Sequence, residues 1–150
     1  MVIGDLMNTG HIGINVTDLD RSRDFYTAVL GLTTMAESQE PARRYAFLAA
    51  ADRLVLTLWE QSEGRFDARA AGLHHLSFEV ATLDDVKAAE ERLRARGAKF
   101  AYEGIVPHSE GAQSGGIFFE DPDGTRLEIY AKSGVSGSAP VAAAPTCGFF

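Results

Sequence analysis

The chain repeats one pattern twice, and this internal repeat is the feature that most restricts its fold. Residues 11–21 and 75–85 each open with a histidine, continue with alternating apolar and polar residues, and reach an Asp/Thr-Leu-Asp step. Alternation with a period of two is typical of a strand with one buried face. Apolar residues then recur every three or four positions, so each half is predicted to begin with a strand followed by a helix.

The first half is predicted to contain one helix and four strands. Asp18 can cap a helix over about 19–30, and Gly31 can end this helix in the left-handed conformation. The strands of this half are expected at about 11–16, 32–38, 44–49 and 53–59.

The second half is predicted to contain the same elements in the same order. Thr82-Leu83-Asp84-Asp85 is typical of a capping box, and it opens a predicted helix over about 83–96. The run Asp121-Pro122-Asp123-Gly124 indicates a turn, because proline fixes φ and glycine accepts a positive φ. The strands of this half are expected at about 73–80, 99–104, 115–120 and 126–131.

The two halves predict a single α+β domain over residues 1–132. Its parts are two βαβββ modules, at about 10–60 and 73–132, joined by a polar, glycine-containing linker over about 61–72. Each module leaves one face of its four-stranded sheet uncovered by its helix, so we expect the two mixed sheets to pair around a cleft. Residues 133–150 are rich in Gly, Ser, Ala and Pro, and we expect a flexible tail there.

Charge and hydropathy argue against several kinds of partner. The formal net charge of −7 makes a nucleic acid or an anionic membrane surface an unexpected partner. Apolar runs fall short of the roughly 20 residues of a membrane span, and residues 1–10 lack the pattern of a secretory signal. The single cysteine, Cys147, cannot form an internal disulfide. Together these features favour a cytoplasmic protein.

The alternation within the strands predicts a metal site. The apolar residues of the strands are expected to face the helices, which leaves His11, His75 and Glu128 on the cleft side. Thr57 holds the position in the first half that Glu128 holds in the second. Two imidazoles and one carboxylate form a 2-His-1-carboxylate site, which leaves about three positions of an octahedral metal open for substrate or oxygen.

Other residues are candidates for roles around this metal site. Tyr130 faces the cleft and His108 lies in a predicted loop over it, so both are candidates for proton transfer; a loop histidine is also commonly a solvated residue. His74 has the wrong parity for a ligand. Aromatic side chains that could line a flat or apolar substrate, or simply pack on the sheets, are Tyr45, Phe47, Trp59 and Tyr130.

These motifs resemble those of the vicinal oxygen chelate superfamily. The matching motifs are the two His-x-x-[Ile/Phe]-x-Val starts, Phe25-Tyr26 with Leu30-Gly31-Leu32, and Asp121-Pro122-Asp123-Gly124 with Leu127-Glu128-Ile129. The superfamily includes glyoxalase I, extradiol dioxygenases, fosfomycin-resistance thiol transferases, methylmalonyl-CoA epimerase and bleomycin-resistance binding proteins. The resemblance covers about residues 10–132. It implies a small-molecule substrate, a homodimer, and one divalent metal ion (Fe, Mn, Ni or Zn) on His11, His75 and Glu128.

The resemblance implies several reactions. Glyoxalase I and the epimerase use a fourth ligand, Glu or Gln, where this chain has Thr57, whose hydroxyl is a poor ligand and cannot act as a carboxylate base. The three-ligand pattern fits dioxygenases and thiol transferases better, but for a transferase's anion site Lys132 is the only cation just after the last strand.

We therefore expect a metal-dependent enzyme that chelates its substrate through vicinal oxygens, with dioxygenase-type chemistry preferred. The alternatives are a glyoxalase-like lyase or isomerase, a fosfomycin-type thiol transferase, and a metal-free binding protein of the bleomycin-resistance type.

Overall fold

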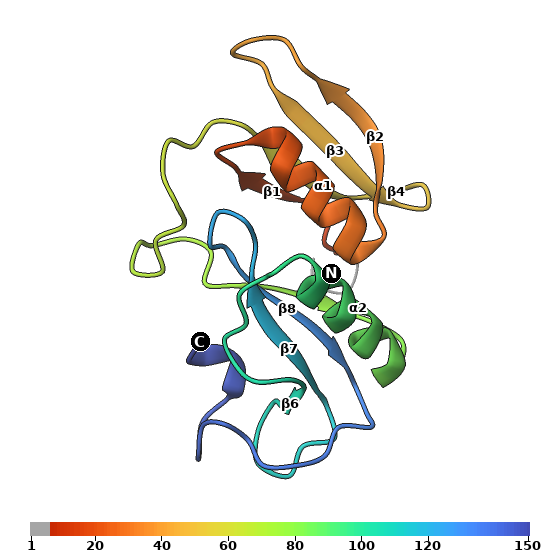
Figure 1. Ribbon diagram of the computed structural model, residues 1–150, viewed down its shortest axis with the longest axis vertical. Coiled ribbons are helices and arrows are strands. Elements are labelled where there is room, and N and C mark those ends of the chain that lie inside the picture. The colour runs from red at the N-terminus through yellow and green to blue at the C-terminus, as the bar shows by residue number, and fades with distance from the viewer. Residues whose placement is uncertain (1–6) are drawn as a thin grey trace. The chain divides into compact units, whose positions relative to one another are not determined.

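The computed structural model describes residues 7–150 and divides the chain into two compact units, Met1–Gly64 and Arg65–Phe150 (Figure 1). Residues 1–6, the start of the predicted domain over 1–132, lie outside the described residues. The division falls inside the predicted linker over 61–72. That the two units act as one domain stays a prediction.

The first unit is a four-stranded mixed sheet with one helix. Its elements are β1 (Ile12–Asn15), α1 (Leu19–Leu30), β2 (Thr33–Ser38), β3 (Tyr45–Ala50) and β4 (Arg53–Trp59). The strand order is β1-β4-β3-β2, with β1 parallel to β4 and the other pairs antiparallel. Helix α1 packs on β3 and β4 and buries the apolar stripe predicted from its sequence (Figure 1).

The ends of α1 form as the sequence predicts. A side-chain oxygen of Asp18 accepts a hydrogen bond from the backbone N–H of Arg21 at 3.0 Å, which caps the first turn. Gly31 has φ +67°, the left-handed conformation that glycine adopts without strain.

The second unit repeats this architecture. Its elements are β5 (Leu76–Glu79), α2 (Leu83–Ala95), β6 (Val106–Pro107), β7 (Gly115–Glu120), β8 (Arg126–Ala131) and a 3₁₀ turn, η2 (Thr146–Gly148). The strand order is β5-β8-β7-β6, and β5 is parallel to β8. The capping box of α2 is confirmed: Asp85 N donates to Thr82 Oγ1 and Thr82 N donates to the Asp85 carboxylate. Both units thus have the predicted βαβββ order and the α+β class.

One predicted strand is wrong. Residues 99–104 do not form a strand, and Phe100 makes only an isolated bridge with Phe119. Gly104 has φ +64°, which turns the chain away from the sheet edge, and pairing resumes only in the two-residue β6. Strand propensity was therefore overridden by a left-handed glycine.

The register of the two parallel strand pairs is the same in both units. Thr57 in β4 pairs with Gly13 in β1, and Glu128 in β8 pairs with Ser77 in β5. Gly13 lies two residues after His11, and Ser77 lies two residues after His75. Thr57 and Glu128 are therefore equivalent positions of the repeat, as the sequence predicts.

The residues after β8 lie against the second unit. Val135 is buried, and its N–H donates to the carbonyl of Gln113 at 3.0 Å. Thr146 is fully buried; its N–H donates to the His108 carbonyl at 2.8 Å and its hydroxyl to the Pro107 carbonyl at 2.6 Å. The flexibility expected of 133–150 concerns motion and stays a prediction, but the segment has defined contacts.

Candidate functional site

The parallel pairing of β5 with β8 brings a histidine beside a glutamate in the second unit. His75 directly precedes β5, and Glu128 lies in β8. The distance from His75 Nε2 to Glu128 Oε2 is 3.8 Å. Glu128 is only 3% exposed, and a buried carboxylate needs polar partners to compensate for its lost hydration.

His108 supplies the second partner of Glu128. Its Nε2 lies 2.5 Å from Glu128 Oε1, which is shorter than an ordinary N–H···O hydrogen bond. Its Nδ1 lies 2.9 Å from the hydroxyl oxygen of Ser114, which fixes the orientation of the ring. His108 is therefore not a solvated loop residue. Each carboxylate oxygen of Glu128 faces one imidazole, that of His75 or that of His108.

The environment of His75 favours its neutral form. Burial is the main cause that lowers the pKa of His75, and the positive charge on His74 and Arg126 adds to it, while the charge of Glu128 opposes the shift. His75 Nδ1 lies 2.8 Å from Nδ1 of His74, so one of these two nitrogens donates to the other. Because Nδ1 of His75 is engaged by His74, Nε2 is the nitrogen that faces Glu128. A neutral imidazole is the form that binds a metal ion.

Tyr130 contributes its ring rather than its hydroxyl to the vicinity of Glu128. The rings of Tyr130 and His108 lie 4.9 Å apart between centroids. The Tyr130 hydroxyl donates to Glu79 Oε2 at 2.8 Å. This hydrogen bond, ahead of burial and the charges of Glu79 and Glu128, raises the pKa of Tyr130. Glu79 also pairs with Lys132, whose Nζ lies 3.0 Å from Glu79 Oε1.

The third predicted ligand, His11, belongs to the first unit. It is exposed and directly precedes β1. Thr57, at the position equivalent to Glu128, is 2% exposed, and its hydroxyl oxygen accepts a hydrogen bond from Trp59 Nε1 at 3.0 Å. Trp59 packs with Tyr45 and Phe47, with ring centroids 5.4 and 5.7 Å away, so these three residues form the aromatic cluster of this unit.

Two of the three predicted metal ligands, His75 and Glu128, lie close together in the second unit. Within residues 7–150, no group of three or more His, Cys, Asp or Glu side chains is arranged to hold a metal ion. His75 Nε2 and Glu128 Oε2, at 3.8 Å, are nevertheless close enough to share one ion with bonds of about 2.1 Å. His11 as the third ligand stays a prediction.

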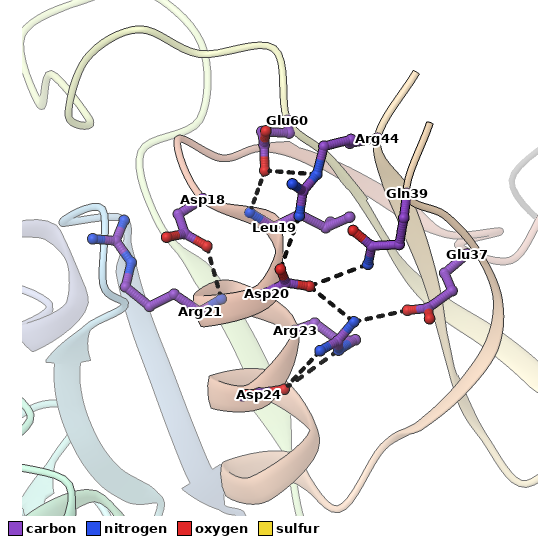
Figure 2. A network of polar contacts seen from close by, with 10 residues as sticks. All are labelled: Asp18, Leu19, Asp20, Arg21, Arg23, Asp24, Glu37, Gln39, Arg44 and Glu60. Carbon is purple, nitrogen blue, oxygen red and sulfur yellow. Dashed lines mark hydrogen bonds and ion pairs between the residues drawn. The ribbon is translucent and has the colours of Figure 1, made fainter. Parts of the chain in front are cut away.

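A polar network in the first unit holds the start of α1 (Figure 2). Glu60 Oε2 accepts a hydrogen bond from the Leu19 N–H at 2.7 Å and pairs with Arg44 Nε at 3.3 Å. Arg44 also donates to Asp20, which pairs in turn with Arg23. Glu60 thus has a structural role at the helix terminus, where the positive end of the helix dipole favours a carboxylate.

Beside this network lies a cavity of about 270 Å³. The residues that line it are Ala42, Arg43, Arg44, Tyr45, Trp59, Glu60 and Gln61. No local pattern in the sequence distinguishes it, since its members come from the β2–β3 connection and the end of β4.

Comparison with known proteins places the chain in a family. The sequence profile of the Glyoxalase/Bleomycin resistance protein/Dioxygenase superfamily matches residues 8–129, and the chain belongs to this superfamily. It is 34% identical over 130 residues to the uncharacterized protein YaeR of Escherichia coli K12, a match that covers 83% of this chain and 96% of YaeR. In the part of the chain that the structure describes, no helix is long and apolar enough to cross a membrane.

Relatives with named activities include a lyase and a dioxygenase. The chain is 34% identical over 139 residues to the lactoylglutathione lyase of Haemophilus influenzae, covering 85% of this chain and 95% of the lyase. It is 26% identical over 125 residues to the catechol-2,3-dioxygenase of Bacillus subtilis, a match that covers 81% of this chain and 40% of the dioxygenase. Among solved structures, the glyoxylase/bleomycin resistance protein/dioxygenase domain from Frankia has a TM-score of 0.70 at 27% identity, covering 84% and 98%.

Proposed function

We propose that this chain is a metal-dependent enzyme that chelates a small substrate through two neighbouring oxygens. Its ligands are His11, His75 and Glu128, and its metal is one divalent ion, Fe, Mn, Ni or Zn. The observation that carries the proposal is the buried carboxylate of Glu128 beside Nε2 of His75, at 3.8 Å. Burying a carboxylate in a sheet is costly, and a function that needs it there explains its presence.

A divalent metal bound to these residues supplies a Lewis acid that polarises the substrate oxygens. The surrounding side chains prepare the ligands for this task. His108 holds one oxygen of Glu128 and leaves the other directed toward His75. His74 engages Nδ1 of His75, so that Nε2 remains the ligating nitrogen.

Dioxygenase-type chemistry is the preferred reaction because the position of a fourth ligand is closed. Thr57 is buried and its hydroxyl oxygen accepts from Trp59, so no carboxylate or amide is available there. The second candidate is a glyoxalase-like lyase, which the 34% identity to a lactoylglutathione lyase favours. A thiol transferase is less well supported, since Lys132 is paired with Glu79.

His108 is the better placed of the two candidates for proton transfer. Its Nε2 is hydrogen-bonded to the proposed ligand Glu128, whereas the Tyr130 hydroxyl donates to Glu79. As the donor to Glu128, Nε2 already carries a proton, so His108 can donate a proton at Nε2 and can accept one only at Nδ1, which lies against the Ser114 hydroxyl. Tyr130 then positions the His108 ring through its own ring.

A small-molecule substrate, a homodimeric assembly and a cytoplasmic location complete this proposal, and all three come from the sequence and its family. Light scattering during size-exclusion chromatography tests the dimer. A monomer at micromolar concentration would refute it.

Metal content measured by plasma mass spectrometry tests the proposed function. We expect about one Fe, Mn, Ni or Zn per chain in the wild type, and loss of the metal in His11→Ala, His75→Ala and Glu128→Gln. Glu91→Gln is the matched control for Glu128→Gln, because it neutralises an exposed carboxylate on α2, outside the proposed site, and it should keep the metal. Circular dichroism confirms that each variant is folded.

An empty wild type that also fails to take up added metal would refute the enzyme and favour the metal-free binding protein. If metal is present, oxygen consumption with a catechol separates a dioxygenase from a lyase. Isomerisation of a hemithioacetal without oxygen uptake would support the lyase.

A further inference from the structure

The ring of Phe150 lies on the sheet face that carries Glu128. Phe118 pairs with Glu128 across β7 and β8, so the two side chains point to the same face. The Phe150 ring centroid is 4.9 Å from that of Phe118 and 6.4 Å from that of Tyr102. It is also 5.5 Å from the imidazole of His75, the proposed metal ligand.

Arg126 completes this pocket with a cation. Its guanidinium carbon lies 5.5 Å from the centre of the Phe150 ring, a distance typical of a cation–π contact. Its Nη1 donates to the main-chain oxygen of Phe150, and its Nε donates to the main-chain oxygen of His74 at 3.0 Å. Arg126 is therefore anchored on one side and presents a donor beside the ring on the other.

The preceding residues deliver Phe150 to this position. Thr146, which opens η2, is fully buried and bonded to the loop around His108. The Tyr102 hydroxyl lies 3.2 Å from the carbonyl oxygen of Thr146 and 3.1 Å from that of Phe149, to which it can donate. The side chain of Phe149 is 63% exposed, so of the two adjacent phenylalanines only Phe150 packs on the sheet.

We propose that Tyr102, Phe118, His75 and Arg126 form an aryl subsite, and that Phe150 is its resident occupant. The ligand class is a molecule with one aromatic ring and an oxygen acceptor about two carbons from it, as the ring and main-chain oxygen of Phe150 are arranged, and the guanidinium of Arg126 favours an anionic acceptor. Such a ligand displaces Phe150. The aryl subsite borders His75, so its use for substrate rests on the proposed function. Binding of an aromatic ligand there does not depend on that function.

The composition of the pocket and the attachment of its occupant both support displacement. Ordinary core packing of a phenylalanine needs no cation, yet this pocket sets a guanidinium donor and an imidazole against the ring. Buried Val135 and Thr146 hold the segment before Phe150, so release of Phe150 needs to move only the residues after Thr146, of which Phe149 is 63% exposed.

Binding of 3-phenylpropanoate to full-length, metal-free protein tests the aryl subsite. The probe reproduces the spacing of ring and oxygen in Phe150, and isothermal titration or ligand-observed NMR gives its Kd. If Phe150 fills the pocket nine-tenths of the time, its removal in Phe150→Ala tightens binding about tenfold, because only empty pockets bind the probe. Phe149→Ala is the matched control and should bind as the wild type does.

Two further arms identify the contacts. Propanoate, which lacks the ring, should bind no variant detectably, and Arg126→Gln combined with Phe150→Ala should lose the tenfold gain. Equal affinity of Phe150→Ala and Phe149→Ala for 3-phenylpropanoate would overturn the proposal. So would binding of propanoate as tight as that of the aromatic acid.

A second measurement does not depend on the affinity of the probe. The Cε1 proton of His75 should shift in the NMR spectrum of Phe150→Ala, because the ring current of Phe150 is lost, and stay in place in Phe149→Ala. Phe150→Leu, which keeps apolar volume for folding, should show the same shift. A His75 resonance unmoved by both Phe150 variants would refute the contact. All of these experiments use metal-free protein, so their outcome does not depend on whether the protein binds a metal. The aryl subsite and the metal-dependent enzyme can therefore be refuted independently.

Discussion

Replacing His108 by leucine should destabilise the second unit by about 3 kcal/mol. Leucine fills a similar volume but cannot donate to Glu128 Oε1, which loses its 2.5 Å hydrogen bond. Glu128 is 3% exposed, so water cannot readily replace the donor, and His75 at 3.8 Å is too distant for a hydrogen bond. A hydrogen bond to a charged group contributes about 1.5–3 kcal/mol, and leaving a buried acceptor unsatisfied costs about 1–3 kcal/mol, more when the acceptor is charged.

The double variant His108→Leu/Glu128→Leu separates pairing from packing. Removing both partners removes the unpaired charge as well, so the double variant should be within about 1 kcal/mol of the wild type. A double-mutant cycle of the wild type, His108→Leu, Glu128→Leu and the double variant should then give a coupling energy of about 2 kcal/mol or more.

Urea titrations at neutral pH with a chelator supply these free energies of unfolding. Far-UV circular dichroism is the suitable signal, because Trp59, the one tryptophan of the sequence, reports on the first unit. If His108→Leu lowers the free energy of unfolding by less than about 1 kcal/mol, Glu128 does not depend on His108. The same conclusion follows if the loss in the double variant equals the sum of the losses in the two single variants.

Three further predictions concern the scaffold. Gly116→Ala should lower the free energy of unfolding in urea by about 3 kcal/mol or more, because an added Cβ would overlap the backbone of β8. Gly13→Ala should lower it by less than about 1 kcal/mol, because its Cβ would lie 3.3 Å from a threonine hydroxyl. Equal losses in the two variants would refute the close approach of β7 and β8 at Gly116. Hydrogen bonds, first from Arg44, lower the pKa of Asp20, so its contribution to stability is present above about pH 4 and disappears as pH falls through that lowered pKa. The difference in unfolding midpoint between wild type and Asp20→Asn should therefore shrink below pH 4, and a constant difference would contradict it. Thr82→Ala should cost about 1 kcal/mol in thermal unfolding, through loss of the α2 cap, and no change in Tm would refute the cap.

Local signals in the sequence were sufficient for most of the fold. Asp18 and Gly31 bound α1, and Thr82 opens α2, because caps act on the backbone within one turn. The alternation in β5 and β8, with the repeat, was enough to predict His75 and Glu128 on one face. Residues 99–104 show the opposite case, since one positive φ at Gly104 outweighs the strand propensity around it.

Long-range contacts account for what the sequence did not reveal. The bond between His108 and Glu128 depends on the path of the loop after β6, which no periodic pattern encodes. The position of Phe150 depends on Thr146 and Tyr102, which are distant in sequence and joined by single hydrogen bonds. Low sequence complexity in 133–150 indicated mobility, but composition cannot show where one phenylalanine packs.

The parallel pairing of β5 with β8 also sets an order of events during synthesis. The first unit has all four strands once Trp59 is made, so its sheet can close while the second is incomplete. In the second unit β5 must wait for β8, the last strand, and until then its hydrogen-bonding edge is open to wrong partners. A chain released before Glu128 is made therefore has a complete first unit and an unpaired β5, and the His75–Glu128 pair can form only once β8 is made.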